Sequence, residues 1–340
     1  MTNGSGLTVA VTGPTGDIGR ALLRALDGSP EVKQVIGMAR RPFDPQAAGL
    51  KKVAYRRGDV LDRAALEDLF SGADVVMHLA FVIFGSIDES RKVNLEGSRN
   101  VFEAAVAANA KRVVYASSVA AYGYHDDAPD LLTEDLEPRG TDAHYYSAQK
   151  AELEGVLAEV LAGSETEAYV FRPCIVSGPD ALMLLENIPY VQLAGRLPEA
   201  VRRLFETIPI VKPVLPDPGV QFQLVHHDDV ASAMLAGVLG HGEPGIYNLA
   251  ASGELTMRDL ADALGYYAVS VPELAVDATA EIVARLPFLP AEATWINAFR
   301  SPVLMDTAKA RSKLSWRPAH DAQATLKQMV TAGRAERTVG

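Results

Sequence analysis

Near its N-terminus the chain reads Leu7-Thr8-Val9-Ala10-Val11-Thr12-Gly13-Pro14-Thr15-Gly16-Asp17-Ile18-Gly19-Arg20-Ala21-Leu22-Leu23. An apolar, β-branched run breaks at glycines and apolar residues then resume at helical spacing, so this stretch predicts a strand, a tight turn and a helix. Gly13 allows the turn, Gly16 lets the backbone approach a pyrophosphate, and Gly19 lets the helix pack closely on the strand. The start of the helix offers N–H groups and a partial positive charge to phosphates. The stretch therefore predicts dinucleotide binding.

Strand-like and helix-like segments alternate along the chain after this stretch. Expected strands cover 31–39, 53–60, 73–80, 112–116 and 169–175, and expected helices cover 63–70, 94–108 and 144–161. This alternation is typical of βαβ units, so we expect an α/β fold, a Rossmann-type doubly wound parallel sheet.

The alternation stops between Asp180 and Gly219, which predicts a second, smaller domain. We expect a dinucleotide-binding domain over 1–175, to which the chain returns at about 219–250 with a strand at 221–225, a helix ending at Leu239 and a strand at 245–249. Residues 176–218 and 251–340, with a helix at 256–264 capped by Thr256, should form mainly the substrate-binding domain.

Composition excludes several classes of partner. A formal net charge of −11 over 340 residues argues against nucleic acid or an anionic membrane surface as the main partner. A single cysteine, Cys174, fits a reducing compartment, and it lies in an apolar strand where we expect it to be inert. The most apolar run, 75–84, is interrupted by His78 and is too short to span a bilayer. With no signal peptide evident, we expect a cytoplasmic protein that does not enter the membrane and acts on a small molecule.

The end of the second expected strand bears on the choice of cofactor. In a dinucleotide fold this point faces the adenosine ribose, where an acidic residue binds the 2′-hydroxyl and an arginine accommodates a 2′-phosphate. Here Ala39 is followed by Arg40 and Arg41, with no acidic residue. The pattern favours NADP over NAD, and two ordinary surface charges remain the alternative.

Polar residues that could do chemistry follow the strand at 112–116. Ser117 and Ser118 come at its C-terminal end, where open α/β sheets bind their ligands. One unit later, Tyr146 and Lys150 stand four residues apart and share a helix face, whereas Tyr145 is out of that register.

With these residues in place, the chain resembles the extended short-chain dehydrogenase/reductase family, which contains nucleotide-sugar epimerases and dehydratases. The matching pieces occur in family order over nearly the whole chain: Thr12 to Gly19, Asp59-Val60, His78-Leu79-Ala80, Asn94, Ser117-Ser118, Tyr122-Gly123, Tyr146 to Lys150, Arg172-Pro173, Gly178-Pro179, His226 to Ala231, Tyr247-Asn248-Leu249, Asp306 to Arg311 and Leu314 to Pro318.

The resemblance implies roles for four residues. Tyr146 would be the general acid/base, Lys150 would lower its pKa and bind the nicotinamide ribose, and Ser118 would hydrogen-bond the reacting oxygen. Asn94 would help hold the proton-relay region. A tyrosine is a poor base near neutral pH, and a neighbouring ammonium favours its phenolate form.

The resemblance also implies a set of cofactor contacts, with Asp59 and Val60 at the adenine and Leu79 and Ala80 lining the cofactor. The full set is Gly13, Thr15, Gly16, Asp17, Ile18, Gly19, Arg40, Arg41, Asp59, Val60, Leu79, Ala80, Ser117, Tyr146, Lys150, Pro173 and Ile175.

Two departures from the family pattern bear on the substrate. Nucleotide-sugar members usually carry an asparagine where this chain has Ile175, and an arginine for the diphosphate where it has Phe222. Apolar residues also surround the expected pocket at 81–84 and 183–185, although they could equally be the core of a lid. We therefore expect hydride transfer to or from a largely apolar ketone or secondary alcohol, with a nucleotide-sugar epimerase or dehydratase as the alternative. The expected substrate contacts are Phe81, Ile83, Ser118, Tyr146, Met183 and Phe222.

Three further expectations concern a metal site, a sensor function and the oligomeric state. Adjacent His226 and His227 should point to opposite faces of a strand, and we expect no metal site. Relatives of the fold that bind NADP as redox sensors usually lack the Tyr/Lys pair, so a non-catalytic sensor is a second alternative. The expected helices 94–108 and 146–161 carry more apolar surface than one sheet face needs, which predicts a homodimer through a four-helix bundle. The residues concerned are Val101, Ala104, Ala105, Ala108, Leu153, Val156, Leu157 and Val160.

Overall fold

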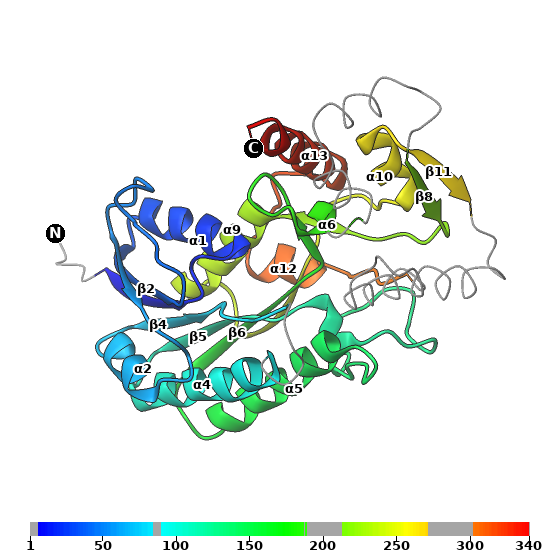
Figure 1. The fold of residues 1–340 in the computed structure, drawn as a ribbon. Coiled ribbons are helices and arrows are strands. Elements are labelled where there is room, and N and C mark those ends of the chain that lie inside the picture. The colour runs from blue at the N-terminus through cyan, green and yellow to red at the C-terminus, as the bar shows by residue number, and fades with distance from the viewer. Residues whose placement is uncertain (1–5, 84–89, 187, 189–212, 271–301, 340) are drawn as a thin grey trace.

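A computed structural model of the chain describes residues 6–83, 90–186, 188, 213–270 and 302–339. Its centre is a seven-stranded sheet in which every pairing is parallel (Figure 1). The strand order is β10 (Gly245–Leu249), β6 (Glu167–Pro173), β5 (Arg112–Ala116), β4 (Val75–His78), β1 (Leu7–Thr12), β2 (Val32–Ala39) and β3 (Val53–Arg57). The order reverses between β1 and β4, which makes this the switch point where doubly wound sheets bind ligands. The predicted Rossmann-type sheet is confirmed.

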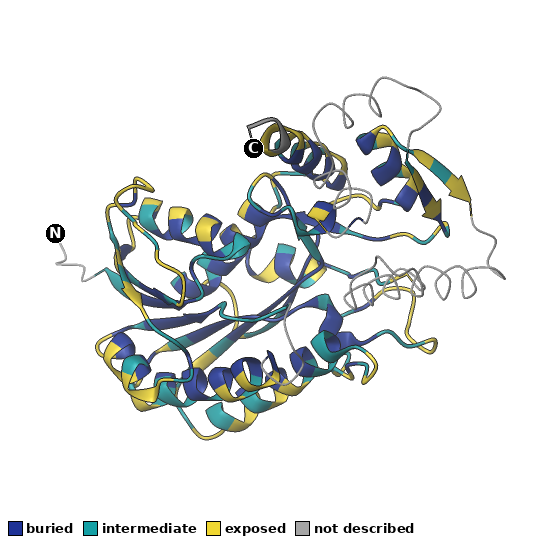
Figure 2. Ribbon diagram, viewed as in Figure 1, coloured by how far each residue is buried: buried dark blue, intermediate teal, exposed yellow. Residues whose placement is uncertain are grey.

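Helices cover both faces of the sheet. The helices α1 (Asp17–Gly28) and α9 (His227–Leu239) lie on one face, and α2 (Arg63–Phe70), α4 (Gly97–Ala107) and α5 (Tyr145–Leu161) lie on the other (Figure 1). Successive strand residues enter opposite cores: Val9 and Val11 join the first cluster, and Ala10 joins the second. Because both faces are covered, the central strands β4 and β5 are almost wholly buried and are dark blue in Figure 2, whereas the edge strand β3 is half-buried or exposed.

A smaller lobe stands beyond the C-terminal edge of the sheet and has its own core. It consists of α6 (Met183–Glu186), β8 (Val214–Asp217), α10 (Met257–Leu264), β11 (Tyr267–Ser270) and α13 (Ala322–Val339). The predicted cap of α10 is confirmed, because Thr256 and Asp259 form a reciprocal capping box. A short parallel pair, β7 (Ile175–Ser177) and β9 (Leu224–His226), joins this lobe to the main sheet.

Several elements differ from the sequence-based expectation. The third strand ends at Arg57, because the chain turns at Gly58 and the Asp59 carboxylate accepts the N–H of Leu61. The expected strand 169–175 is two strands: β6 ends at Pro173, and Ile175 begins β7 in another sheet. The helix expected from Asn94 begins with a π-helical turn, η1 (Lys92–Glu96). In addition, α12 (Ala308–Lys313) and Trp316 pack with the first cluster, although 251–340 was assigned mainly to the substrate side.

The outer surface of α4 and α5 bears on the predicted dimer. Val101 and Leu153 are fully buried within one copy, since they face the sheet, whereas Ala104 and Val156 are only partly buried. Arg99 forms an ion pair with Glu159 across the two helices. The apolar surface left for a partner is therefore smaller than the sequence suggests, and the homodimer stays a prediction.

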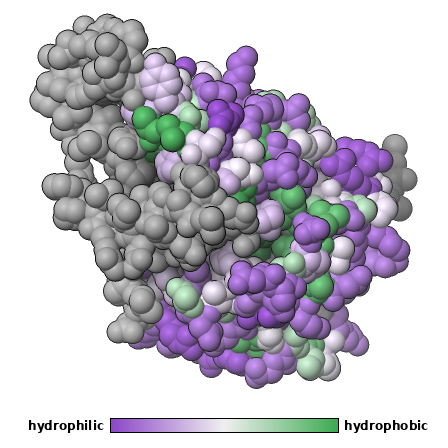
Figure 3. All heavy atoms as spheres, turned by 90° about the vertical axis from the view of Figure 1, so that its right-hand side faces the viewer, coloured by the Kyte–Doolittle hydropathy of each residue, from purple (hydrophilic) through white to green (hydrophobic). Residues whose placement is uncertain are grey.

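The rest of the described surface is polar with scattered apolar side chains. On the face shown in Figure 3, hydrophilic residues predominate and apolar ones form small patches. The most exposed large apolar residues include Val214, Tyr267 and Val269 on β8 and β11. No helix in the described parts of the chain is long and apolar enough to cross a membrane.

Candidate active site

The glycine-rich turn sits at the switch point of the sheet. Gly13 has φ +76°, and a Cβ there would lie 2.5 Å from the backbone nitrogen of Ala80. A Cβ on Gly19 would lie 2.6 Å from the carbonyl of Pro14, so both glycines are required by close packing. Around Gly16 the nearest atom to a Cβ would be 3.7 Å away, and α1 begins there without a side-chain cap. The start of α1 thus has the open approach and uncapped N-terminal end that a pyrophosphate needs.

Asp17 adds a carboxyl group to this turn. It is half-buried, and burial raises its pKa while Arg20, His227 and Arg41 act in the opposite direction. Arg41 therefore lies within electrostatic reach of the phosphate turn as well as at the end of β2. Thr15 and Ile18 are half-buried beside it.

Three arginines gather at the C-terminal ends of β2 and β3. Arg40 and Arg41 are exposed, and within the described residues neither guanidinium has a hydrogen bond or ion pair. Arg57 is in register with Ala39, and its Nε donates to the Arg40 carbonyl at 3.0 Å. Sequence analysis missed Arg57, although the parallel pairing of the two strands was the signal that could have found it. Asp59 is half-exposed just beyond this group.

The Val60 side chain is not part of this open region. It is 6% exposed and packs in the second core cluster, and its carbonyl accepts a hydrogen bond from Asn100. Leu79 and Ala80 follow β4 and are half-buried next to Gly13.

Ser118, Tyr146 and Lys150 come together at the carboxyl end of β5. Ser118 caps a 3-10 turn, η2 (Val119–Tyr122), where its hydroxyl accepts the N–H of Ala120 at 3.2 Å. Burial raises the pKa of the Tyr146 phenol, and the neighbouring Ser118 hydroxyl opposes the increase. Lys150 is one turn along α5, with its Nζ 5.9 Å from the centre of the Tyr146 ring. The expected helix face is therefore present.

The ammonium group of Lys150 is buried and is held by uncharged groups. Lys150 is only 3% exposed. Its Nζ donates to the Ala116 carbonyl at 2.7 Å and to the Tyr115 hydroxyl at 3.4 Å. It also lies 4.0 Å from the centre of the Phe81 ring, a cation–π distance. Burial lowers the pKa of Lys150 to about 7, against the opposing effect of Glu154. Sequence analysis did not find Tyr115 as a neighbour of the lysine.

Asn94 lies in the π-helical turn and acts on the segment after β4. Its amide accepts from the Val82 N–H at 2.8 Å and donates to the Val82 carbonyl at 2.9 Å. It also donates to Gln149 at 2.8 Å, a contact that sequence analysis missed. Through these bonds Asn94 holds the chain that carries Phe81 over Lys150.

Other sequence-derived candidates have structural partners. His78 is bonded to Thr12 at 2.7 Å and to Ser98 at 2.8 Å, and burial lowers its pKa to about 3, so it is a packed neutral residue. The Ser117 hydroxyl donates to Glu154 at 2.5 Å, so it faces the interior of the protein. Cys174 is buried, and burial raises the pKa of its thiol, which fits an inert cysteine.

Comparison with known proteins identifies the family to which this site belongs. The model of the NAD-dependent epimerase/dehydratase family matches residues 9–250. The chain belongs to this family. As a member of the extended short-chain dehydrogenase/reductases it is an NAD(P)-dependent enzyme, and a nicotinamide dinucleotide is its cofactor.

Two curated relatives and one solved structure illustrate the range of this family. The uncharacterized protein y4nG of Sinorhizobium fredii is 27% identical over 325 residues, covering 92% of this chain and 75% of that protein. Ceramide reductase of Caulobacter vibrioides is 30% identical over 229 residues, covering 67% of this chain and 60% of that protein. MoeE5 in complex with UDP-glucuronic acid and NAD has a TM-score of 0.71 at 20% identity, covering 97% of this chain and 99% of that chain, which shows a shared fold. Apart from y4nG, the chain spans 30% to 60% of the length of the first curated relatives that it matches.

Aromatic side chains lie near Tyr146. The Phe81 ring meets Tyr146 edge to face at 5.4 Å. Tyr124 lies 5.2 Å from His144, and burial raises its pKa to about 12 with Tyr146 as a further cause. Sequence analysis did not identify Tyr124, because the loop that carries it has no periodicity. The Ile83 carbonyl accepts a hydrogen bond from Tyr145.

The remaining residues expected near the substrate lie partly in the core of the small lobe and partly at half-buried positions beside it. Phe222 is 5% exposed, is bridged to Leu255 and packs in the core of the small lobe, so its ring fills that core. Ile175 packs against the same core, while Met183 is half-buried on α6. Pro173 is buried at the end of β6. Phe84 lies outside the described residues.

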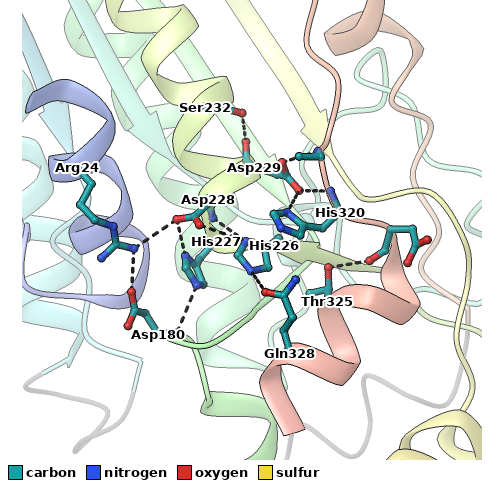
Figure 4. Close-up of polar contacts among 12 residues, drawn as sticks. Arg24, Asp180, His226, His227, Asp228, Asp229, Ser232, His320, Thr325 and Gln328 are labelled. Atoms are coloured by element: carbon teal, nitrogen blue, oxygen red, sulfur yellow. Dashed lines mark hydrogen bonds and ion pairs between the residues drawn. The ribbon is translucent and has the colours of Figure 1, made fainter. Parts of the chain in front are cut away.

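A histidine cluster forms the junction between the sheet and the small lobe (Figure 4). The expectation that His226 and His227 point apart is wrong: β9 ends at His226 and α9 begins at His227, so their rings are 4.3 Å apart. Nδ1 of His226 accepts the N–H of Asp228, and its Nε2 faces Gln328 at 3.2 Å. The nearby Asp228 carboxylate is bonded to Arg24, which supplies the positive charge there.

Proposed function

We propose that the chain transfers a hydride between NADP(H) and a largely apolar ketone or secondary alcohol, with Tyr146 as the general acid/base. The observation that carries this proposal is the placement of Tyr146 and Lys150 on one face of α5, with the Lys150 Nζ 5.9 Å from the centre of the Tyr146 ring and the Phe81 ring against both side chains. Ser118 lies close enough to Tyr146 to lower the pKa of its phenol. A bound nicotinamide dinucleotide would supply the hydride. The protein's own part is to hold the reacting oxygen and to move the proton.

Each residue of the trio has a distinct part in this chemistry. In the reduction direction the Tyr146 hydroxyl gives its proton to the substrate oxygen, while Ser118 donates a hydrogen bond to the same oxygen. The positive charge of Lys150 favours the tyrosinate that remains. Because burial raises the pKa of Tyr146, this stabilisation is needed for the reverse direction, in which tyrosinate removes a proton from an alcohol.

Apolar surroundings favour a substrate with little polarity. Phe81 lies against Tyr146. Where nucleotide-sugar members usually carry the asparagine and the arginine that bind the diphosphate, the sequence has Ile175 and Phe222, and both pack with the small lobe's core. Loss of two such charge-assisted bonds would cost roughly 1.5–3 kcal/mol each. The similarity to a ceramide reductase points in the same direction.

We further infer that the cofactor is NADP rather than NAD. Arg40, Arg41 and Arg57 concentrate positive charge where the adenosine ribose would lie, and no acidic side chain follows β2 directly. A 2′-phosphate would give these guanidinium groups a partner.

The test combines binding, turnover and a matched pair of variants. NADPH oxidation is followed with a panel of apolar ketones and aldehydes, while UDP-sugars are compared in a thermal-shift panel. Tyr146→Phe should bind NADPH almost normally while turnover falls by roughly 10²–10⁴. Tyr145→Phe removes the neighbouring hydroxyl, which donates to the Ile83 carbonyl; it is the control and should lose far less turnover than Tyr146→Phe.

Three outcomes would contradict the proposal. Full activity of Tyr146→Phe would show that Tyr146 is not the general acid/base. A UDP-sugar as the best ligand would support the nucleotide-sugar epimerase or dehydratase instead. Binding of NADPH without turnover of any carbonyl in the panel would support the redox sensor.

A further inference from the structure

A buried ion pair lies one turn beyond Lys150 on α5. The side chains of Arg172 and Glu154 are 0% and 5% exposed, with Nη2 to Oε2 at 2.5 Å and Nε to Oε1 at 2.9 Å. The Ser117 hydroxyl donates to the same carboxylate at 2.5 Å. The pair therefore ties α5 to the ends of β5 and β6, the two strands beneath the catalytic trio.

Helical spacing places Glu154 in line with the catalytic residues. Tyr146, Lys150 and Glu154 are successive i, i+4 positions, so they share one face of α5. Arg172 approaches this face from β6, and its guanidinium stacks 4.3 Å from the centre of the Tyr122 ring. The order of charges along the face is thus ammonium, carboxylate and guanidinium.

The other titratable groups around Lys150 provide no negative charge near neutral pH. Burial raises the pKa values of Tyr115 on β5 and Tyr146 on α5, so both phenols are neutral. Burial lowers the pKa of His78 on β4 to about 3, so its imidazole is neutral as well. Among the described groups that act on Lys150, Glu154 is left as the source of negative charge.

We propose that Glu154 is a positioning residue for Lys150: its carboxylate keeps the buried side chain an ammonium, and Arg172 partly neutralises that carboxylate so that Lys150 can release and regain a proton. A buried ammonium without a nearby carboxylate would be strongly disfavoured. A carboxylate without Arg172 beside it would instead favour the charged form of Lys150 more strongly. The inference deepens the proposed function, on which the catalytic part of Lys150 rests.

The proposal predicts opposite effects from removing the two partners. Glu154→Gln leaves the Arg172 charge and should lower the pH at which Lys150 titrates by about one unit. Arg172→Met exposes the full charge of Glu154 and should raise that pH by about one unit or more. The double variant should fall between them. A purely structural role would not produce shifts of opposite sign.

The experiment measures the charge of Lys150 directly in the whole chain without cofactor. The protein is labelled with [ε-13C]lysine, and the Lys150 resonance is assigned by its loss in Lys150→Met. The chemical shift of this resonance is followed from pH 5.5 to pH 10, and the wild-type midpoint is expected at about 7. Glu159→Gln is the matched control, because it removes an exposed carboxylate from a bidentate pair with Arg99 on the same helix. It should leave the midpoint unchanged.

If Glu154→Gln does not fold, the carboxylate of Glu154 can still be tested by removing it from a protein that already carries Arg172→Met. Arg172→Met and the double variant differ only at Glu154, and their midpoints should differ by about one pH unit. Equal midpoints in these two variants would overturn the inference, whatever the enzyme does with NADPH. Conversely, the expected shifts in a protein that neither binds NADPH nor turns over carbonyls would support the inference and refute the proposed function.

Discussion

Replacing Gly13 by alanine tests the closest approach in the cofactor site. The new Cβ would lie 2.5 Å from the nitrogen and 2.7 Å from the Cα of Ala80, and 2.8 Å from the carbonyl carbon of Leu79. All three are backbone atoms of the segment that follows β4, so no side-chain rotation relieves the overlap. The overlap should cost about 1–3 kcal/mol, and a non-glycine residue at φ +76° costs about 1–2 kcal/mol more.

The expected result is a free energy of unfolding lowered by about 2–5 kcal/mol. Relief of the overlap requires the end of β4 to move from β1, with which it pairs through Thr12 and His78. This movement would disturb the switch point, so the affinity for NADPH should fall as well. Urea unfolding followed by circular dichroism and a fluorescence titration with NADPH measure the two effects.

Gly49→Ala is the matched control for the backbone strain. Gly49 has φ +75°, almost equal to that of Gly13, but a Cβ there would meet nothing within 4 Å. It should therefore lose about 1–2 kcal/mol at most and keep its NADPH affinity. Equal destabilisation of Gly13→Ala and Gly49→Ala would refute the contact between the turn and Ala80.

Three further predictions concern cofactor choice, acid stability and assembly. Replacing both Arg40 and Arg41 by alanine should weaken NADP binding about tenfold or more while leaving NAD binding unchanged. The control is Arg56→Ala, which removes a guanidinium paired with Asp68. Equal affinities of the wild-type protein for NADP and NAD would contradict the prediction. His78 has a pKa of about 3 when folded and 6.5 when unfolded, so the unfolded chain binds more protons between these values and stability should fall by about 5 kcal/mol as the pH drops through this window. His78→Gln should abolish this part of the pH dependence, and an unchanged pH profile of the urea midpoint would argue against it. Light scattering at micromolar concentration should give twice the chain mass of 36.3 kDa, whereas a monomer mass would exclude the dimer.

Local patterns in the sequence were sufficient for the sheet, the glycine turn and the Tyr146–Lys150 face. A period of two or 3.6 residues marks a strand or a helix, and glycines at a turn signal backbone conformations or approaches that other residues do not allow. Pairs four residues apart on one helix are neighbours whatever surrounds the helix. These features depend on residues close together in the chain, so they could be predicted before any tertiary contact was known.

Tertiary structure decided which distant residues meet and which side chains are buried. Arg57 joins Arg40 only because β2 and β3 pair in parallel. Phe222 was expected to line the substrate site, but it belongs to the small lobe's core, since its backbone bridges to that of Leu255. The carboxylate of Glu154 meets Arg172 and Ser117 because α5 packs over β5 and β6. Contacts of this kind depend on how separate elements pack, and neither spacing nor periodicity within a segment encodes that packing.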